Sequence, residues 1–496
     1  MVGGAIAVAK FPFPPYFETT MNILRAIHLL RSTVLPLTIV LSITLVSRLP
    51  FIDAGYGNDP DSWGVAETAR QISLTGAYSV SRFPGYPVQE VVSSLLWPWG
   101  APVLNLATVF MSVLATCFFY LICRHIDVPY PMLTALVMAF TPVIFIASTA
   151  TIDYMWALGF LMGSTYFVLR RQPLLAGIFL GGAIGCRITS GVMLAPLAIL
   201  LVFQTNSSRT RTRDMMIFVM SACSLGAMAF LLPYLTYGPS FFAYNPGVSK
   251  SIFDTVIDTV RKASVGVWGR IGAIVLTLCV AILPFTNRTT EEHSVYLRFK
   301  NSPMFAAVLV AIVLQGIAFV LLPHESGYLI PVVPLLILLL ANLSKRWVYV
   351  VLCGAIVISS FVSFDLTGIV PGPVLADHAD RIYWLNFIDY VIKEVETLEG
   401  RNIVIAGDWY PKLLPSLRRR YSGDEEYKLM FRASDSIEYV YFLSDTRLID
   451  RLKDGWNVYY LPGQMVHVAH GDTSRARALV SDEYSVARSL LTVDSE

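Results

Sequence analysis

The chain has 496 residues and a formal net charge of +2, with 55% hydrophobic and only 15% charged residues. Soluble globular proteins carry about 25% charged residues, so this composition and a mean hydropathy of +0.59 exclude an ordinary soluble domain. The chain is predicted to be a polytopic α-helical membrane protein, and no sequence module for nucleic-acid binding appears in it.

Eleven apolar stretches are candidates for transmembrane helices, each of which needs about 20 mainly apolar residues. The first stretch is expected to act as an uncleaved signal anchor that follows a cytoplasmic N-terminus at residues 1–33, and a transmembrane domain is expected over 34–364. The stretches lie near 34–50, 102–123, 130–149, 153–169, 173–189, 190–204, 214–235, 268–286, 303–322, 328–343 and 347–364.

Positive charges indicate the orientation of these stretches, because cytoplasmic loops carry the excess of Lys and Arg. They collect on alternate connections, as an inside N-terminus requires, and eleven spans then leave the C-terminus outside a plasma or inner membrane. The count is least secure at 173–204, where Arg187 interrupts a glycine-rich apolar run. Either two short helices meet near Arg187 or one tilted helix crosses there, and the Arg-rich loop at 209–213 favours two.

Three outer segments are long enough to carry a function: 51–101, 236–267 and 365–496. In the first, Asp59 before Pro60 is typical of a helix N-cap, and Gly76 is a natural helix end. A helix is therefore predicted over 60–75. Its apolar residues recur at three-residue spacing, so it is predicted to lie in the plane of the membrane interface; they are Trp63, Ala66, Ala69 and Ile72.

Three aspartates are the candidate acids. Asp59 is well explained as a cap, and the helix dipole alone favours an acid such as Asp61 in a first turn. Asp153 lies in a very short outer turn, where an ionisable side chain at the membrane surface is costly and usually functional. The competing interpretation of Asp153 is an N-cap for a helix that begins at residue 154.

Several cations lie on the predicted outer side, where few are expected, and they need anionic partners. Arg82 follows the first outer helix, and Arg187 is flanked by apolar helix with no acid near it in sequence, so it calls for a phosphate or a carboxylate from another helix. His324 could carry a proton, bind a metal or donate to phosphate. No His or Cys cluster has metal-ligand spacing, so no metal site is assigned, and all six cysteines lie inside or at the ends of apolar stretches.

Together these residues resemble the GT-C superfamily of polyprenyl-phosphate-dependent glycosyltransferases, particularly its aminoarabinose and protein-mannosyl transferase branch. The resemblance covers roughly residues 30–345 and rests on three stretches. The first is 61–71 (DSWGVAETARQ) with the turn 84–87 (PGYP), the second joins Asp153 to 176–187 (AGIFLGGAIGCR), and the third is 324–331 (HESGYLIP). In the third stretch, Gly327 stands where the pattern has Arg.

The resemblance implies that a sugar moves from a polyprenyl monophosphate to a glycan, lipid or protein acceptor at the outer face. It implies Asp61 as the general base, with Asp59 as the alternative, and Asp153 as a residue that orients the acceptor or holds a divalent cation, the one cofactor left open. The donor phosphate is expected to contact Arg82, Arg187, Tyr328 and His324. The acceptor or interface side is expected to include Tyr86, Trp63 and Glu325.

A single displacement would invert the anomeric centre without a covalent intermediate. Two other classes of protein remain open from the sequence. A secondary transporter would show internal repeats and charges near the middle of the membrane, and a non-catalytic lipid-binding protein would tolerate Asp61→Asn.

The segment 365–496 is richer in charge than the rest and is predicted to be a small extracytoplasmic α/β domain. Residues 403–408, 439–443 and 457–461 are predicted strands, and helices near 381–398 and 445–454 alternate with them, which is typical of a parallel sheet. The last twenty-five residues are predicted to form a solvated helix or end.

Overall fold

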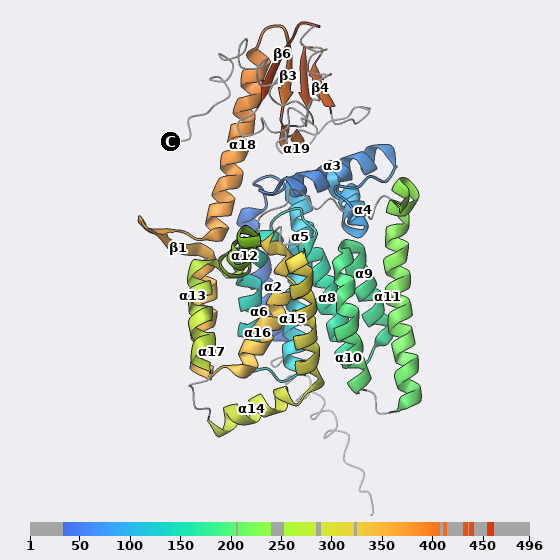
Figure 1. Ribbon diagram of the computed structural model, residues 1–496, viewed down its shortest axis with the longest axis vertical. Coiled ribbons are helices and arrows are strands. Elements are labelled where there is room, and N and C mark those ends of the chain that lie inside the picture. Colours follow the sequence, from blue (N-terminus) through green and yellow to red (C-terminus); the bar gives the residue numbers. More distant parts are fainter. Residues whose placement is uncertain are drawn as a thin grey trace, which may run out of the picture.

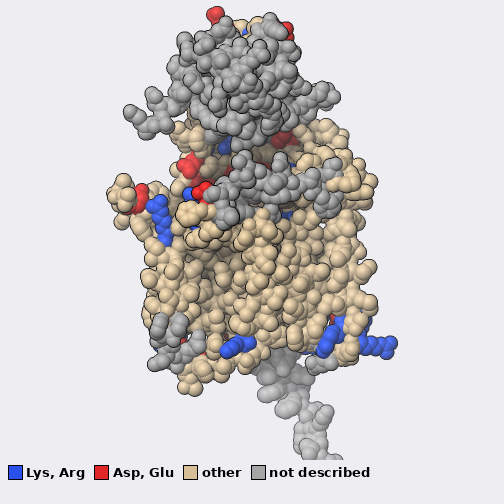
Figure 2. Space-filling model, viewed as in Figure 1, with Lys and Arg blue, Asp and Glu red and all other residues tan. Residues whose placement is uncertain are grey.

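The computed structural model describes residues 33–204, 207–239, 252–283, 289–321, 325–406, 410–413, 430–434, 436–440 and 454–460. A bundle of apolar helices forms the larger part, and a layer of shorter helices and a small sheet covers one end of it (Figure 1). Lys and Arg gather at the opposite end and near the covering layer, while the flank of the bundle between them shows almost no charge (Figure 2). This distribution is that of a protein that crosses a membrane.

Helices occupy all eleven apolar stretches. Among the described residues, four helices are long and apolar enough to cross a membrane alone, and the pair α6–α7, bent by 67°, is a fifth if it counts as one span. Six further apolar helices are shorter, so the number eleven stays a prediction. The helices are α2 (Leu35–Arg48), α5 (Ala101–His125), α6 (Pro131–Phe140), α7 (Pro142–Ser148), α8 (Tyr154–Leu169), α9 (Pro173–Cys186), α10 (Leu194–Gln204), α11 (Ser208–Tyr237), α13 (Val267–Ile282), α15 (Pro303–Leu321), α16 (Val332–Leu343) and α17 (Arg346–Phe361).

The uncertain run at 173–204 forms two helices, as the charge pattern favours. Arg187 leaves the helical conformation, with φ −160° and ψ 112°, and a 3₁₀ turn at Ile188–Met193 leads into α10. The glycines of α9 let it approach α11 closely: a Cβ on Gly177 would lie 2.5 Å from the Phe218 carbonyl oxygen, and one on Gly181 would lie 2.7 Å from Leu225 Cβ. Small residues at this spacing permit close helix packing within a membrane.

The predicted first outer helix is confirmed as α3 (Pro60–Thr75), with the Asp59 carboxylate accepting from the Asp61 amide at 2.9 Å and Gly76 at φ 68°. It lies across the end of the bundle (Figure 1). Its apolar side does not face lipid, however, because Trp63 and Ala66 are buried in a cluster with Leu104 and Ile388. The prediction of an interfacial helix is therefore wrong about what covers that side.

The covering layer also contains α4 (Pro87–Leu96), α12 (Ile252–Arg261) and the long helix α18 (Pro373–Thr397), which follows a hairpin of β1 (Val362–Asp365) and β2 (Gly368–Pro371). Helix α14 (Thr290–Lys300), which was not predicted, lies across the opposite end of the bundle (Figure 1). Residues 240–251 of the predicted outer loop 236–267 fall outside the described residues.

Three predicted C-terminal strands are present as β3 (Arg401–Ile405), β5 (Ile437–Val440) and β6 (Trp456–Tyr460). Strand β3 runs parallel to both of the others, and β4 (Met430–Ser434) adds an antiparallel edge in the order β4-β5-β3-β6. A short helix, α19 (Tyr410–Leu413), follows β3. The predicted helix at 445–454 and the last twenty-five residues lie outside the described residues, so the extent of the predicted domain 365–496 stays a prediction.

Candidate active site

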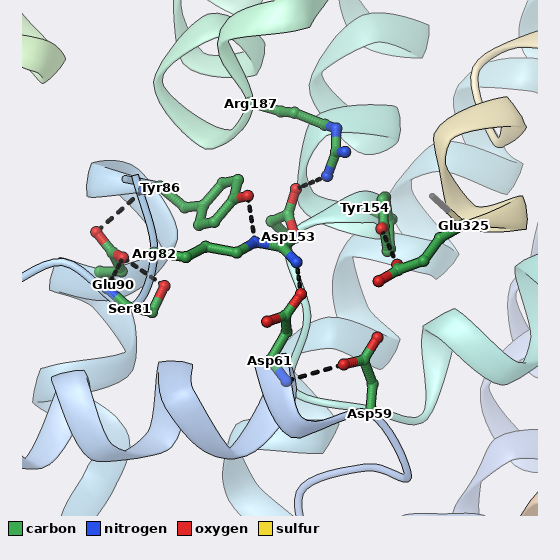
Figure 3. A network of polar contacts seen from close by, with 10 residues as sticks. All are labelled: Asp59, Asp61, Ser81, Arg82, Tyr86, Glu90, Asp153, Tyr154, Arg187 and Glu325. Atoms are coloured by element: carbon green, nitrogen blue, oxygen red, sulfur yellow. Dashed lines mark hydrogen bonds and ion pairs between the residues drawn. The ribbon is translucent and has the colours of Figure 1, made fainter. Parts of the chain in front are cut away.

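Five segments that are distant in sequence bring most of the predicted site residues together at the covered end of the bundle (Figure 3). They are the start of α3, the turn between α3 and α4, the turn between α7 and α8, the break between α9 and α10, and the turn before α16. The side chains that meet there are Asp59, Asp61, Arg82, Tyr86, Asp153, Tyr154, Arg187, Glu325 and Tyr328.

Arg82 connects the two halves of this cluster. Its guanidinium pairs with Asp61 and lies 3.5 Å from the Asp153 carboxylate, and its Nε donates to the Tyr86 hydroxyl at 2.5 Å. About a quarter of the Arg82 side chain is exposed, and the Asp61 side chain is 31% exposed. Arg82 and Asp61 are therefore the members of this ion-pair chain that a ligand can reach.

Asp153 and Arg187 form the buried end of the chain. Their atoms lie 2.5 Å apart, and Asp153 is fully buried. The Arg187 guanidinium lies between the rings of Tyr154 and Tyr328, 4.4 and 4.3 Å from their centroids, where cation–π attraction adds to the ion pair. The partner that Arg187 calls for is thus a carboxylate from another segment, one of the two anions predicted.

This position changes the interpretation of Asp153. Both of its carboxylate oxygens contact guanidinium groups, and it makes no side-chain capping bond to α8. Two adjacent positive charges oppose the binding of a metal ion, and complete burial leaves no surface for an acceptor. The predicted roles of holding a cation and orienting the acceptor stay predictions, and the contacts that the structure shows for the Asp153 carboxylate are with the two arginines.

The other half of the cluster is acidic. Carboxylate oxygens of Asp59, Asp61 and Glu325 lie within 4.8 Å of one another, and the Tyr154 hydroxyl donates to Glu325 at 2.5 Å. Burial, together with the nearby Glu325 charge, raises the pKa of Asp59 to about 7. Protonation of one of the two carboxylates, or a cation bound between them, would relieve the repulsion between Asp59 and Glu325.

These three carboxylates are the described residues best suited to hold a divalent cation. A set of oxygens without His or Cys fits a hard ion such as Mg²⁺ or Mn²⁺ rather than Zn²⁺. No spacing in the sequence marks this set, because it contains no His or Cys and because Glu325 is 264 positions from Asp61 in the chain.

A second buried acid, Glu90, holds the turn that carries Arg82. It is fully buried and accepts from the Ser81 amide at 2.8 Å, the Ser81 hydroxyl at 2.7 Å, the Tyr86 amide at 3.1 Å and the Tyr78 hydroxyl at 2.5 Å. Four donors satisfy the carboxylate so completely that its function is to fix the backbone on both sides of Arg82.

Asn105 of α5 holds the two aspartate-bearing loops together. Its amide nitrogen donates to the carbonyls of Ile52 and Gly55, at 2.8 Å each, and its amide oxygen accepts from the Thr151 hydroxyl at 2.8 Å. The Thr151 amide in turn donates to the Tyr56 carbonyl at 2.7 Å. One buried side chain therefore sets the distance between the Asp61 loop and the Asp153 turn.

The covering layer also bonds to these loops. Arg381 of α18 donates to the Thr149 carbonyl at 2.9 Å and pairs with Asp377 at 2.6 Å. Lys412 of α19 donates to the Asn58 carbonyl at 3.0 Å, and burial lowers its pKa to about 8. No sequence motif marks the two bonds to the Thr149 and Asn58 carbonyls, because they join residues more than 200 positions apart.

A cavity of about 470 Å³ opens beside the acidic half of the cluster, between the bundle and α18. Asp59, Glu325 and Tyr154 line one side, and Asp377 and Arg381 line another. Two buried polar atoms of its lining, Ser62 Oγ and Arg381 Nε, have no hydrogen-bond partner among the described residues. The polar side chains on its lining give the cavity groups that can hydrogen-bond a bound molecule.

Two predicted site residues are not among those that the structure brings together in the cluster. Trp63 is only 3% exposed, and its indole nitrogen donates to the Gly57 carbonyl at 2.8 Å, so its predicted contact with an acceptor is not supported. His324 lies outside the described residues, and its predicted phosphate contact stays a prediction. Gly327, where the family pattern has Arg, packs so closely on Tyr154 that a Cβ would lie 2.6 Å from the ring.

The fold and the cluster define a multi-pass membrane protein that presents paired acids and arginines at one end of its helix bundle. No protein-family model and no curated protein matches the sequence. Among solved structures, the chain is similar to ArnT from Cupriavidus metallidurans, both bound to undecaprenyl phosphate and in the apo state. Each comparison has a TM-score of 0.51 and 14% sequence identity, and covers 77% of this chain and 84% of that chain. The predicted GT-C fold is thereby confirmed.

Proposed function

We propose that the protein is a membrane glycosyltransferase that moves a sugar from a polyprenyl monophosphate to an acceptor hydroxyl at the outer face of the plasma membrane. The observation that carries the proposal is the ion-pair chain from Asp61 through Arg82 and Asp153 to Arg187, partly exposed at one end and buried at the other. The N-terminus would then be cytoplasmic and the C-terminal segment extracytoplasmic.

Arg82 and Arg187 supply the positive charge that a departing phosphate needs. Arg187 is held between two rings and is almost fully buried, whereas Arg82 is partly exposed and presents the group that a donor can approach. A phosphate monoester binds the planar guanidinium as a carboxylate does. We infer that the donor phosphate takes the place of Asp61 on Arg82.

This exchange would prepare the base. Asp61 released from Arg82 remains beside Asp59 and Glu325, which line the cavity where an acceptor would lie. It then takes the proton of the acceptor hydroxyl while the hydroxyl oxygen attacks the anomeric carbon and the bond to the phosphate oxygen breaks. One displacement of this kind inverts the anomeric centre, and Asp61 needs no covalent bond to the sugar.

The test uses purified protein in nanodiscs and a panel of radiolabelled polyprenyl-phosphate sugars, with transfer to a membrane extract as the readout. Asp61→Asn is expected to lower transfer on the order of 10²- to 10⁴-fold, as loss of a general base does, while binding of polyprenyl phosphate persists. Asp53→Asn, an exposed acid of the same loop, is the matched control and is expected to retain full activity.

Full activity of Asp61→Asn would contradict the proposal and would favour a lipid-binding protein without catalysis. Loss of activity in Asp59→Asn but not in Asp61→Asn would move the base to Asp59. A protein that carries labelled substrate across the membrane without forming product would be a transporter instead.

A further inference from the structure

A second cavity, of about 560 Å³, lies at the opposite end of the bundle from the candidate active site. It is formed where α5, α8, α10 and α16 end and α14 and α15 meet, and no part of the proposed reaction uses it. Its volume is in the range of ordinary ligand pockets, about 300–1,000 Å³.

The lining of this cavity is divided into a cationic and an apolar part. Arg170 and Arg171, which follow α8, and Arg298 of α14 line it, and Asp127 is the only acid among the described residues of the lining. The apolar part includes Leu169 and Phe299, which are buried. A site with this division fits an anion that carries an apolar tail.

The arginines are available for a ligand. Arg170 and Arg171 are exposed and make no ion pair in the described parts of the chain. Arg298 pairs with Asp127 at 3.6 Å, but their side chains are 58% and 73% exposed, and such a surface pair contributes little.

The backbone of the lining supports the same conclusion. Arg171 has φ 55° and Asp127 has φ 54°, in the left-handed region that residues with a Cβ seldom adopt. Backbone strain of this kind concentrates at functional sites. The two turns therefore keep the Arg171 and Asp127 side chains at the cavity in a strained backbone conformation. The packing of the bundle must offset the free-energy cost of this strain.

We propose that this cavity binds a phosphate group, supplied by the headgroup of an anionic phospholipid. The guanidinium groups recognise the phosphate oxygens, and Leu169 and Phe299 contact the start of the acyl chains. Basic pockets between helix ends at a membrane surface bind lipid headgroups in this way. The proposal does not depend on the proposed glycosyl transfer, because none of the candidate active-site residues lines the cavity.

The experiment is native mass spectrometry of the full-length protein with phosphatidylglycerol or phosphatidylcholine of matched acyl chains. Phosphatidylglycerol is expected to bind at least tenfold more tightly than phosphatidylcholine. The triple variant Arg170→Gln/Arg171→Gln/Arg298→Gln is expected to lose this preference. The control variant Arg209→Gln/Arg211→Gln/Arg213→Gln removes as much charge from the start of α11, outside the cavity, and is expected to keep it.

A second arm separates a lipid from a soluble anion. Millimolar inorganic phosphate is added and the melting temperature is measured in detergent. A phosphate-dependent rise in the wild type that the triple variant lacks, without a lipid preference, would support the phosphate site and assign it to a soluble ligand. Equal binding of both lipids together with no response to phosphate, or an unchanged lipid preference in the triple variant, would overturn the proposal.

Discussion

Replacement of Asp153 by Asn tests whether this residue holds the two arginines or binds the acceptor. The substitution keeps the shape of the side chain and removes its charge. Arg82 still pairs with Asp61 and bonds to Tyr86, but Arg187, 6% exposed, loses its one ion pair among the described residues. The contacts with its two flanking rings remain.

The expected cost is large because the pair is buried. Removal of one partner from a buried ion pair destabilises proteins by about 3–5 kcal/mol, since the remaining charge is left uncompensated. The cation–π contacts of Arg187 with its two flanking rings are present both before and after the substitution, so they do not offset this penalty. We therefore expect a clear fall in the melting temperature of Asp153→Asn in detergent.

A double-mutant cycle separates the two roles. If Asp153 holds Arg187, the double variant Asp153→Asn/Arg187→Gln removes both charges and recovers a large part of the lost melting temperature. If Asp153 contacted an acceptor, the single variant would keep its melting temperature and raise only the acceptor KM. Failure of the double variant to exceed Asp153→Asn in stability would refute the positioning role.

Three further substitutions test the surroundings of the cluster. Asn105→Ala leaves three buried groups without partners and should destabilise by about 3 kcal/mol, near 1 kcal/mol for each; an unchanged melting temperature would contradict this. Gly327→Ala places a Cβ against the Tyr154 ring and should cost about 1–3 kcal/mol and lower activity, whereas Gly316→Ala, with no atom within 4 Å of its Cβ, is a neutral control. The folded-state pKa of Asp59, about 7, exceeds the ordinary 3.8, so the folded protein binds more protons between these values and loses stability as pH rises through them. Asp59→Asn keeps a good N-cap and should be the more stable protein at pH 8, by at most roughly 4 kcal/mol, and an equal pH dependence in both would refute this.

Local signals explain why parts of this fold follow from the sequence. Both ends of helix α3 could be predicted from the sequence. Asp59 and Pro60 act on the first turn of the helix, and Gly76 acts on its last turn. The break at Arg187 was favoured because charge alternates across a membrane. The strands β3, β5 and β6 were found from short apolar runs, whereas the helix α14, with few apolar residues, gives no such signal.

The contacts that organise the site depend on tertiary structure and could not be found in this way. In the sequence, Asn105 is one polar residue in an apolar helix. Its function follows only from its hydrogen bonds to Ile52, Gly55 and Thr151. The burial of Asp153 between two arginines could not be predicted for a related reason. An exposed turn and a buried turn have the same sequence signature, and burial between two arginines changes what a carboxylate can do.

Gly327, at the position where the GT-C pattern has Arg, also affects the packing of the side chains around Arg187. The absence of a side chain there lets the Tyr154 ring approach the turn, and this ring is one of the two that enclose Arg187. An arginine at 327 would need the space of that ring, and it would add a third positive charge near Arg82 and Arg187. The glycine at position 327 and the position of the Arg187 guanidinium therefore both depend on where the Tyr154 ring packs. We expect Gly327→Arg to displace Tyr154 from Glu325 and to lower donor binding, and a variant that bound donor more tightly would contradict this account.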